Sequence, residues 1–141
     1  MSRHTDVAVQ ALEALAAGDV ETMERLYAPD FVFHSQLPGK DAGHNGLRDR
    51  ALLLSSSLYD AELLIDLVVE GGEYVTCQWR GRAVHKGDLL GIRPTGRSVE
   101  VGGLTLFRFA GEQIVAEWTE FDSVGLLSQL DALPSRRAPR I

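Results

Sequence analysis

The chain has 141 residues, of which 45% are hydrophobic and 24% charged, as in an ordinary globular protein. Its net charge of −6 argues against a nucleic-acid-binding surface, and no apolar run is long enough for a membrane span. A single cysteine, Cys77, cannot form an internal disulfide and favours a reducing, cytoplasmic location. We therefore expect one domain over residues 1–131, a tail over 132–141, and neither a nucleic-acid nor a membrane partner.

The first part of the chain predicts two helices. Residues 3–17 place apolar side chains on one helical face, and Gly18 is a suitable stop. Asp19 is a suitable N-cap for a second helix, which we expect Pro29 to end. A short strand is expected at residues 31–34, followed by a loop over 36–46.

The second part of the chain predicts one more helix and then a sheet. Leucine and alanine recur at helical spacing over residues 47–58, with Asn45 available as a cap. Strand-like alternation follows over residues 61–70 and 74–85, and a glycine-containing connection runs over 86–97. Asp122 is expected to cap a last helix that continues through Leu130.

Residues 99–121 predict a β-hairpin whose turn is Gly111 to Gln113. Pairing across this turn places Ala110 opposite Ile114, Phe107 opposite Glu117, and Thr105 opposite Thr119. One face of the hairpin then carries Val101, Gly103, Thr105, Phe107, Phe109, Val115, Glu117, Thr119 and Phe121.

Neither face of this hairpin is properly polar. The face with Glu117 is expected to cover a core or pocket, and the opposite face, with Leu106 and Trp118, to be covered by a partner. The sequence therefore predicts a homodimer. Helices gathered at the start, before a mostly antiparallel sheet, indicate an α+β fold in which a curved sheet wraps around the helices.

Glu117 is the first candidate for a catalytic residue, because it is the one carboxyl group on the predicted pocket face. A carboxyl group among apolar neighbours is suited to act as a general acid or base. The alternative is an ordinary ion pair with Arg80 or Arg82, and the sequence does not decide between these interpretations.

His34 is a second catalytic candidate, since it ends a short strand at the expected edge of the cavity. His85 and Trp79 fall on the less polar face of the strand over 74–85 and are candidate substrate-binding residues, although both types are often simply part of a core. The histidines lack the spacing of a metal site, so we predict no metal.

Five segments of the chain carry a family resemblance: LYAPDFVFH (26–34), GLRDR (46–50), HKGDLLGIRPTGRSVE (85–100), LFRFAGEQIVAEW (106–118) and DSVGLLSQL (122–130). In these segments the chain resembles the SnoaL-like polyketide cyclase and ester cyclase family. The resemblance implies the cone-shaped nuclear transport factor 2-like (cystatin-like) α+β fold. It also implies ring closure of a polyketide by aldol chemistry, without metal or cofactor.

The family's acid/base pair is an aspartate after the Glu-Trp dipeptide and a histidine on the neighbouring strand. These positions are Thr119 and Thr105 here, so both usual groups are replaced by hydroxyls that cannot act as a general base near neutral pH. The resemblance still implies a pocket for an apolar oxygenated molecule, with Thr105, Phe107, Thr119 and Phe121 as further substrate-binding candidates.

Two functions follow as hypotheses. In the first, the chain is a cofactor-free enzyme that promotes ring closure, isomerisation or hydroxylation of a polyketide-like substrate. In the second, it is a non-catalytic small-molecule-binding or accessory protein on the same fold. Convergence of Glu117, His34 or His85 on one open cavity would favour the enzyme.

Overall fold

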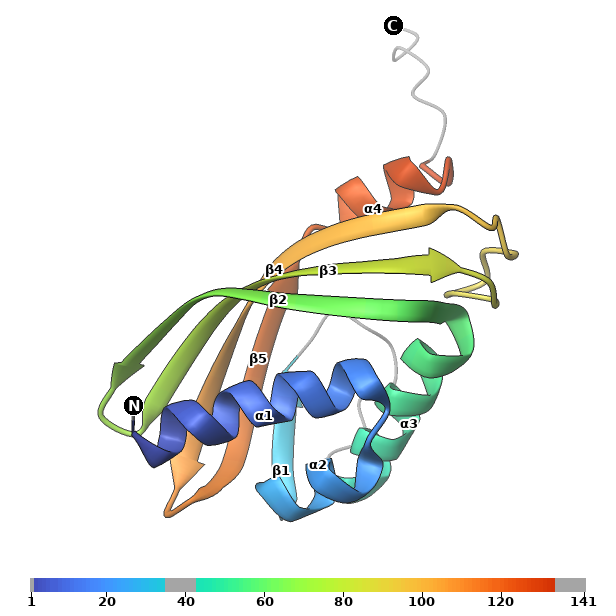
Figure 1. The fold of residues 1–141 in the computed structure, drawn as a ribbon. Coiled ribbons are helices and arrows are strands. Elements are labelled where there is room, and N and C mark those ends of the chain that lie inside the picture. The colour runs from blue at the N-terminus through green and yellow to red at the C-terminus, as the bar shows by residue number, and fades with distance from the viewer. Residues whose placement is uncertain (1, 35–42, 134–141) are drawn as a thin grey trace, which may run out of the picture.

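The computed structural model describes residues 2–34 and 43–133, which form four helices and one five-stranded sheet (Figure 1). The helices are α1 (Arg3–Ala17), α2 (Val20–Leu26), α3 (Gly43–Ser57) and α4 (Ser123–Gln129). The strands are β1 (Tyr27–His34), β2 (Leu58–Gly71), β3 (Tyr74–His85), β4 (Ser98–Ala110) and β5 (Gln113–Phe121). The predicted α+β class is confirmed.

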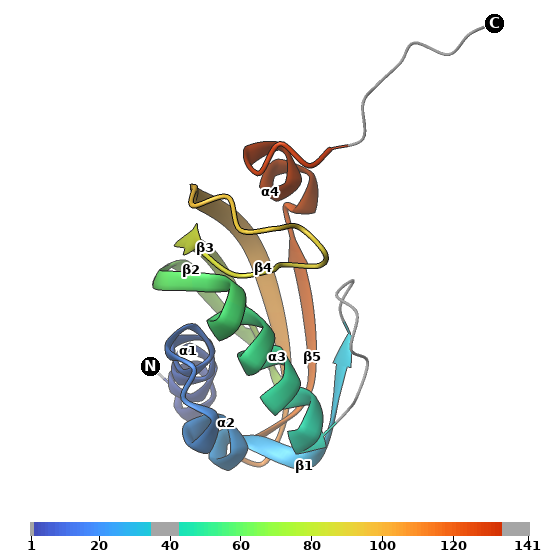
Figure 2. The same cartoon turned by 90° about the vertical axis from the view of Figure 1, so that its right-hand side faces the viewer.

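The sheet has the strand order β1-β5-β4-β3-β2. Strand β1 runs parallel to β5, and the other neighbouring pairs are antiparallel. The sheet curves, and α1 and α3 lie against its concave side (Figure 2). The core between these layers is built from small, aliphatic and aromatic apolar residues such as Ala8, Met23, Phe31 and Phe109.

The helix boundaries follow the predicted caps at most ends. Gly18 ends α1 with a φ of 70°, as predicted, and the Ser2 side chain, which was not predicted as a cap, accepts a hydrogen bond from Thr5 N at its start. Asp19 caps α2 and Asp122 caps α4, as predicted. Helix α3 begins at Gly43, so the prediction of Asn45 as its cap is wrong.

The start of β1 differs from the prediction. Helix α2 ends at Leu26, and the chain is already extended at Tyr27, before Pro29. The reason is pairing with β5, in which Tyr27 is opposite Ile114 and Phe33 is opposite Glu117. Of the expected loop over residues 36–46, residues 43–46 belong to α3, so the prediction is wrong there. The rest of that loop lies outside the described residues, as does most of the predicted tail.

The hairpin of β4 and β5 has the predicted register in its centre. Thr105 is opposite Thr119 and Phe107 is opposite Glu117. Near the turn a β-bulge shifts the pairing, so Ile114 lies opposite Phe109 and not Ala110 as predicted. The shift brings Ile114 into the core, where its side chain is fully buried.

Among the described residues, no helix is both long enough and apolar enough to cross a membrane.

Candidate functional site

A pocket of about 270 Å³ lies between the concave side of the sheet and helices α1 and α3. Its lining is mostly aliphatic and aromatic, with side chains from both helices, from the strands, from the connection before β4 and from α4. Four of its lining residues, Arg50, Trp79, Thr105 and Thr119, are connected by hydrogen bonds and, through Glu117, by an ion pair. We call the part of the pocket that they line its inner end. A pocket of this composition suits an apolar molecule with few polar groups.

A buried ion pair lies at the inner end of the pocket. Arg50 Nη1 is 2.8 Å from Glu117 Oε2, the Arg50 side chain is 10% exposed, and that of Glu117 is fully buried. The Tyr27 hydroxyl donates a hydrogen bond to Glu117 Oε1. The guanidinium group also lies over the ring of Phe33, with Cζ 4.1 Å from the ring centroid.

The backbone explains why these groups meet. Glu117 occupies an inward position of β5 between Phe107 on β4 and Phe33 on β1. Arg50 lies one helical turn after Leu47 on α3, so it shares the buried face of that helix. The helix face and the strand face therefore bring one cation and one carboxylate together in the interior.

A chain of hydrogen bonds connects the pocket wall to Glu117. Trp79 Nε1 donates to Thr105 Oγ1 at 3.0 Å, the two threonine hydroxyls are 3.1 Å apart, and Thr119 donates to Glu117 Oε2 at 3.0 Å. A carboxylate only accepts hydrogen bonds, so the single proton of Thr119 is used on Glu117 and Thr105 must donate to Thr119. The protons of this chain are all directed toward Glu117.

The negative charge of Glu117 also affects its buried neighbours. Burial, and then the charge of Glu117, raise the pKa of Tyr27 well above its usual value. The same two causes, in the same order, raise the pKa of the Cys77 thiol to about 11. Both groups are therefore neutral near pH 7, and the Tyr27 hydroxyl keeps the proton that it donates to Glu117.

Of the predicted substrate-binding residues, Trp79, Thr105, Thr119 and Phe121 line the pocket. Phe107 does not: it is fully buried in the core on the same face. Glu117 itself lies directly behind the lining, in contact with Arg50 and Thr119.

The predicted placement of His34 at the cavity edge is wrong. Side chains alternate along β1, so Phe31 and Phe33 point inward and His34 points outward. The His34 ring stacks on Trp118 with ring centroids 4.8 Å apart, on the outer face of the sheet.

His85 is buried, as its strand pattern predicted, but it does not line the pocket. Its Nδ1 accepts a hydrogen bond from Thr95 N at 3.3 Å and lies 3.0 Å from Thr95 Oγ1. His85 thus binds the connection between β3 and β4 through Thr95. Glu117, His34 and His85 do not converge on one cavity.

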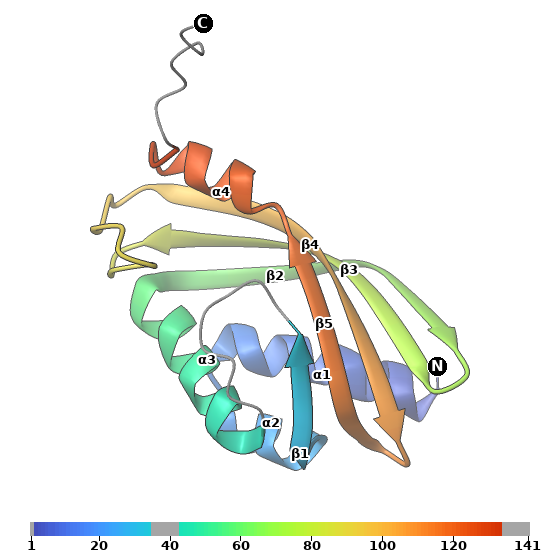
Figure 3. The ribbon, with the colours of Figure 1, turned by 180° about the vertical axis from the view of Figure 1, so that it is seen from behind.

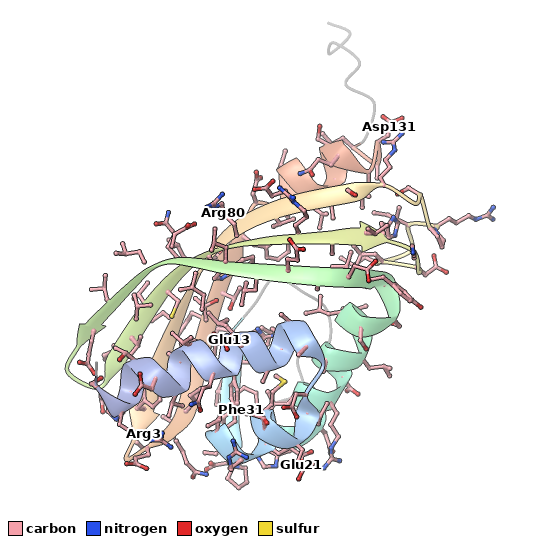
Figure 4. The ribbon with its side chains drawn as sticks, in the orientation of Figure 1. Arg3, Glu13, Glu21, Phe31, Arg80 and Asp131 are labelled. Atoms are coloured by element: carbon pink, nitrogen blue, oxygen red, sulfur yellow. The ribbon has the colours of Figure 1, made fainter. Side chains whose placement is uncertain are left out.

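The alternative interpretation of Glu117, an ion pair with an arginine, is confirmed by Arg50, but the two arginines named as its partners are wrong. Arg80 and Arg82 occupy outward positions of β3, where Arg80 binds Asp66 at 2.8 Å and Arg82 approaches Glu100. Figure 4 shows Arg80 on the side of the sheet away from α1.

Sequence reasoning missed Arg50 and Tyr27, although each had a signal. Arg50 follows Leu47 by three residues and precedes Leu54 by four, which places it on the apolar face of its helix. Tyr27 follows Met23 by four residues, a spacing that places it on the apolar face of the second helix. A charged residue on an apolar helix face is the signal that identifies a buried ion pair.

Within the described parts of the chain, no three His, Cys, Asp or Glu side chains gather in a way that could hold a metal ion.

Comparisons with known proteins agree with this architecture. The SnoaL-like polyketide cyclase family matches residues 5–130, and no functionally curated protein matches the sequence. Among solved structures, IdmH from Streptomyces antibioticus, described as a proposed polyketide cyclase, has 28% sequence identity and a TM-score of 0.80, with 92% of this chain and 99% of that chain covered.

TsrD from Streptomyces laurentii has 26% identity and a TM-score of 0.82, with 91% of this chain and 94% of that chain covered. AclR from Streptomyces galilaeus, described as a proposed hydroxylase, has 19% identity and a TM-score of 0.80, covering 96% and 89%, and supports the fold alone. With a family match over nearly its whole length, the chain belongs to the SnoaL-like polyketide cyclase family.

Proposed function

We propose that the chain is a cofactor-free enzyme that binds an apolar, oxygenated, polyketide-like molecule and moves a proton at a carbon next to a carbonyl group. The observation that supports this proposal is the Glu117 carboxylate, which is fully buried and linked to the pocket by the Thr119 hydroxyl at 3.0 Å. The family and the apolar lining of the pocket support the class of ligand.

Glu117 is the base in this proposal and Thr119 carries the proton to it. The substrate C–H proton passes to Thr119 Oγ1 while the hydroxyl proton of Thr119 passes to Glu117 Oε2. The electron pair of the C–H bond forms an enolate, so one negative charge moves from Glu117 to the substrate oxygen. An enolate is the nucleophile of aldol ring closure and the intermediate of double-bond isomerisation. His34 has no part in this step.

Deuterium exchange tests the proposal without knowledge of the natural substrate. The small bicyclic ketone 2-tetralone has exchangeable protons next to its carbonyl group, and NMR in D₂O follows their loss. We expect the wild-type protein to accelerate this exchange and Glu117→Gln to lower the accelerated rate by about a hundredfold or more, because a general base contributes on that order.

Glu120→Gln is the matched control, since Glu120 is an exposed carboxyl group three residues further along β5. This variant should exchange 2-tetralone at the wild-type rate. Wild-type protein that is no faster than buffer, or Glu117→Gln protein that is as fast as wild type, would contradict the proposal.

A second candidate is non-catalytic binding of the same class of molecule. Two observations favour it. Both Glu117 oxygens have partners, with the carboxylate behind the pocket lining. In addition, Glu117, His34 and His85 do not converge on one cavity. This function predicts that 2-tetralone binds in the pocket and that the bound ketone exchanges no faster than the free ketone.

We also propose that the protein forms a homodimer through the outer face of its sheet. This face, seen from behind in Figure 3, carries apolar side chains that are exposed or half-buried. We call them the outer patch; its members are Val32, Leu67, Val69, Leu104, Leu106 and Trp118. A second copy of the same patch would remove this apolar surface from water.

A further inference from the structure

At the inner end of the pocket, most hydrogen-bond donors are already used within the protein and are not available to a ligand. The Trp79 N–H group is used on Thr105, the Thr105 hydroxyl on Thr119, and the Thr119 hydroxyl on Glu117. These three lining residues therefore have no proton left to donate to a ligand. Within the polar group at this end, Arg50 is the remaining lining residue with donor groups.

Arg50 is not fully satisfied by Glu117. Its Nη1 is 2.8 Å from Glu117 Oε2, yet among the described residues Nη1 has no acceptor in good hydrogen-bond geometry. The contact is therefore an ion pair in which the N–H groups of Nη1 are not well aligned with the carboxylate. A guanidinium group has five N–H donors in a rigid fork, so one carboxylate oxygen leaves donor capacity unused.

Nη1 itself is closed off beside Glu117, so it is the rest of the guanidinium group that can meet a ligand. The side chain is nine-tenths buried, the guanidinium group is held over the ring of Phe33, and the residue lines the pocket. A cation held in an apolar wall forms a stronger hydrogen bond to a ligand oxygen than the same cation in water would.

We propose that Arg50 binds an oxygen atom of the ligand, and that the pocket selects flat apolar molecules with an acceptor oxygen, such as a ketone or enolate, at one end. The inference rests on the proposed function and specifies its substrate class. In the proton-transfer step the negative charge moves from Glu117 to the ligand oxygen, and Arg50 is next to the charge both before and after the step. Arg50 is thus the group that stabilises the enolate.

A matched pair of ligands tests the inference. The ketone 2-tetralone and the hydrocarbon tetralin share a bicyclic skeleton and differ in one carbonyl oxygen. Trp79 in the pocket reports binding by fluorescence once Trp118, the other tryptophan, is changed to Phe in every protein used. The quantity compared is the ratio of the tetralin Kd to the 2-tetralone Kd, because the solvation of the two free ligands then cancels between variants.

We expect Arg50→Met to lower this ratio about tenfold, which is the loss of one hydrogen bond to a charged group. Since that variant leaves Glu117 buried without its cation and could unfold, the double variant Arg50→Met with Glu117→Gln removes both charges and should show the same lowered ratio. Glu117→Gln alone keeps Arg50 and should keep the preference for the ketone.

Arg48→Met is the control, because Arg48 lies two residues earlier on the same helix, is exposed, and binds Glu24 at 2.6 Å. It should leave the ratio at the wild-type value. An unchanged ratio in the double variant, with both ligands bound, would overturn the role of Arg50 and leave the proposed function standing. Failure of both ligands to bind wild-type protein would overturn the ligand class and the proposed function together.

Discussion

Arg50 and Glu117 are buried residues that depend on each other. Removing water from two charged groups costs several kcal/mol each, and their mutual attraction offsets this cost only while both are present. Tyr27 and Thr119 lower the cost further by donating hydrogen bonds to the two carboxylate oxygens. A buried ion pair next to an apolar pocket is a candidate functional site.

The buried thiol of Cys77 gives a pH dependence whose sign can be stated. Its folded-state pKa is about 11, above the ordinary value of 9.0, because burial and the charge of Glu117 both disfavour the thiolate. The stability linked to this group is complete below pH 9 and is lost as the pH rises toward 11. In that window the unfolded chain releases a proton that the native protein keeps, so the free energy of unfolding falls by about 1.4 kcal/mol per pH unit.

Cys77→Ala removes this contribution. Urea unfolding of both proteins at several values between pH 8 and pH 11 should show a shallower decline for the variant. The raised pKa of Tyr27 also lowers the free energy of unfolding at high pH, and it does so in both proteins. The difference between the two slopes therefore reports Cys77 alone. Identical slopes would show that the thiol has the same pKa in the folded and unfolded states.

The sequence predicted part of the site at the level of single residues. Strand alternation and the hairpin turn predicted that Thr105 lies opposite Thr119. The structure confirms this pairing, with the two hydroxyl oxygens 3.1 Å apart. The burial of Glu117 was foreseen for the same reason. Its partner was not, because Arg50 and Glu117 are 67 residues apart and only the packing of α3 against the sheet joins them.

At the level of the elements, Gly103 on β4 leaves the space that the Trp79 ring occupies in the pocket wall. A Cβ atom at Gly103 would lie 2.5 Å from Trp79 Cζ2 and 2.8 Å from the carbonyl oxygen of Glu120. The indole ring of Trp79 therefore lies where any larger residue would place its side chain. The absent side chain at position 103 allows Trp79 to lie flat along the wall and to donate to Thr105.

Gly103→Ala should displace Trp79, weaken ligand binding in the pocket, and lower the free energy of unfolding by about 1–3 kcal/mol, the usual cost of overpacking. Trp79 fluorescence and urea unfolding measure the two effects.

Gly102→Ala is the control on the neighbouring residue, because its Cβ would approach nothing nearer than 3.8 Å. Equal behaviour of the two alanine variants would mean that Gly103 does not position the indole ring.

The elements themselves were largely predictable, and the exceptions share a cause. Helices α1 and α4 and strand β3 have clear periodicity and the expected caps or faces. The early start of β1 and the bulge between β4 and β5 were missed. Both depend on pairing with another strand, which local sequence patterns do not encode.

On the scale of the whole molecule, the curved sheet separates two surfaces with different roles. Helices α1 and α3 lie on its concave side (Figure 2), and the pocket and the ion pair lie between these helices and the sheet. Its outer side carries the outer patch, where Leu104 is 50% exposed and Val69 is 53% exposed. The proposed homodimer explains why alternation along β4 and β5 leaves apolar residues on both faces.

Leu104→Glu should convert the homodimer to a monomer, because it would place two carboxylates against apolar surface at the shared interface. Sedimentation equilibrium of both proteins measures the change. Leu52→Glu is the control, since Leu52 is 66% exposed and lies on α3, whereas the outer patch lies on the strands. A wild-type protein that is monomeric at high concentration would contradict the homodimer.

The most direct test of the central claim uses the exchange assay with Thr119→Val, which removes one hydroxyl and keeps the shape of the side chain. If proton transfer runs from the ligand through Thr119 to Glu117, this variant binds 2-tetralone about as well as the wild-type protein but exchanges its protons no faster than buffer. Exchange at the full wild-type rate in Thr119→Val protein would contradict the account.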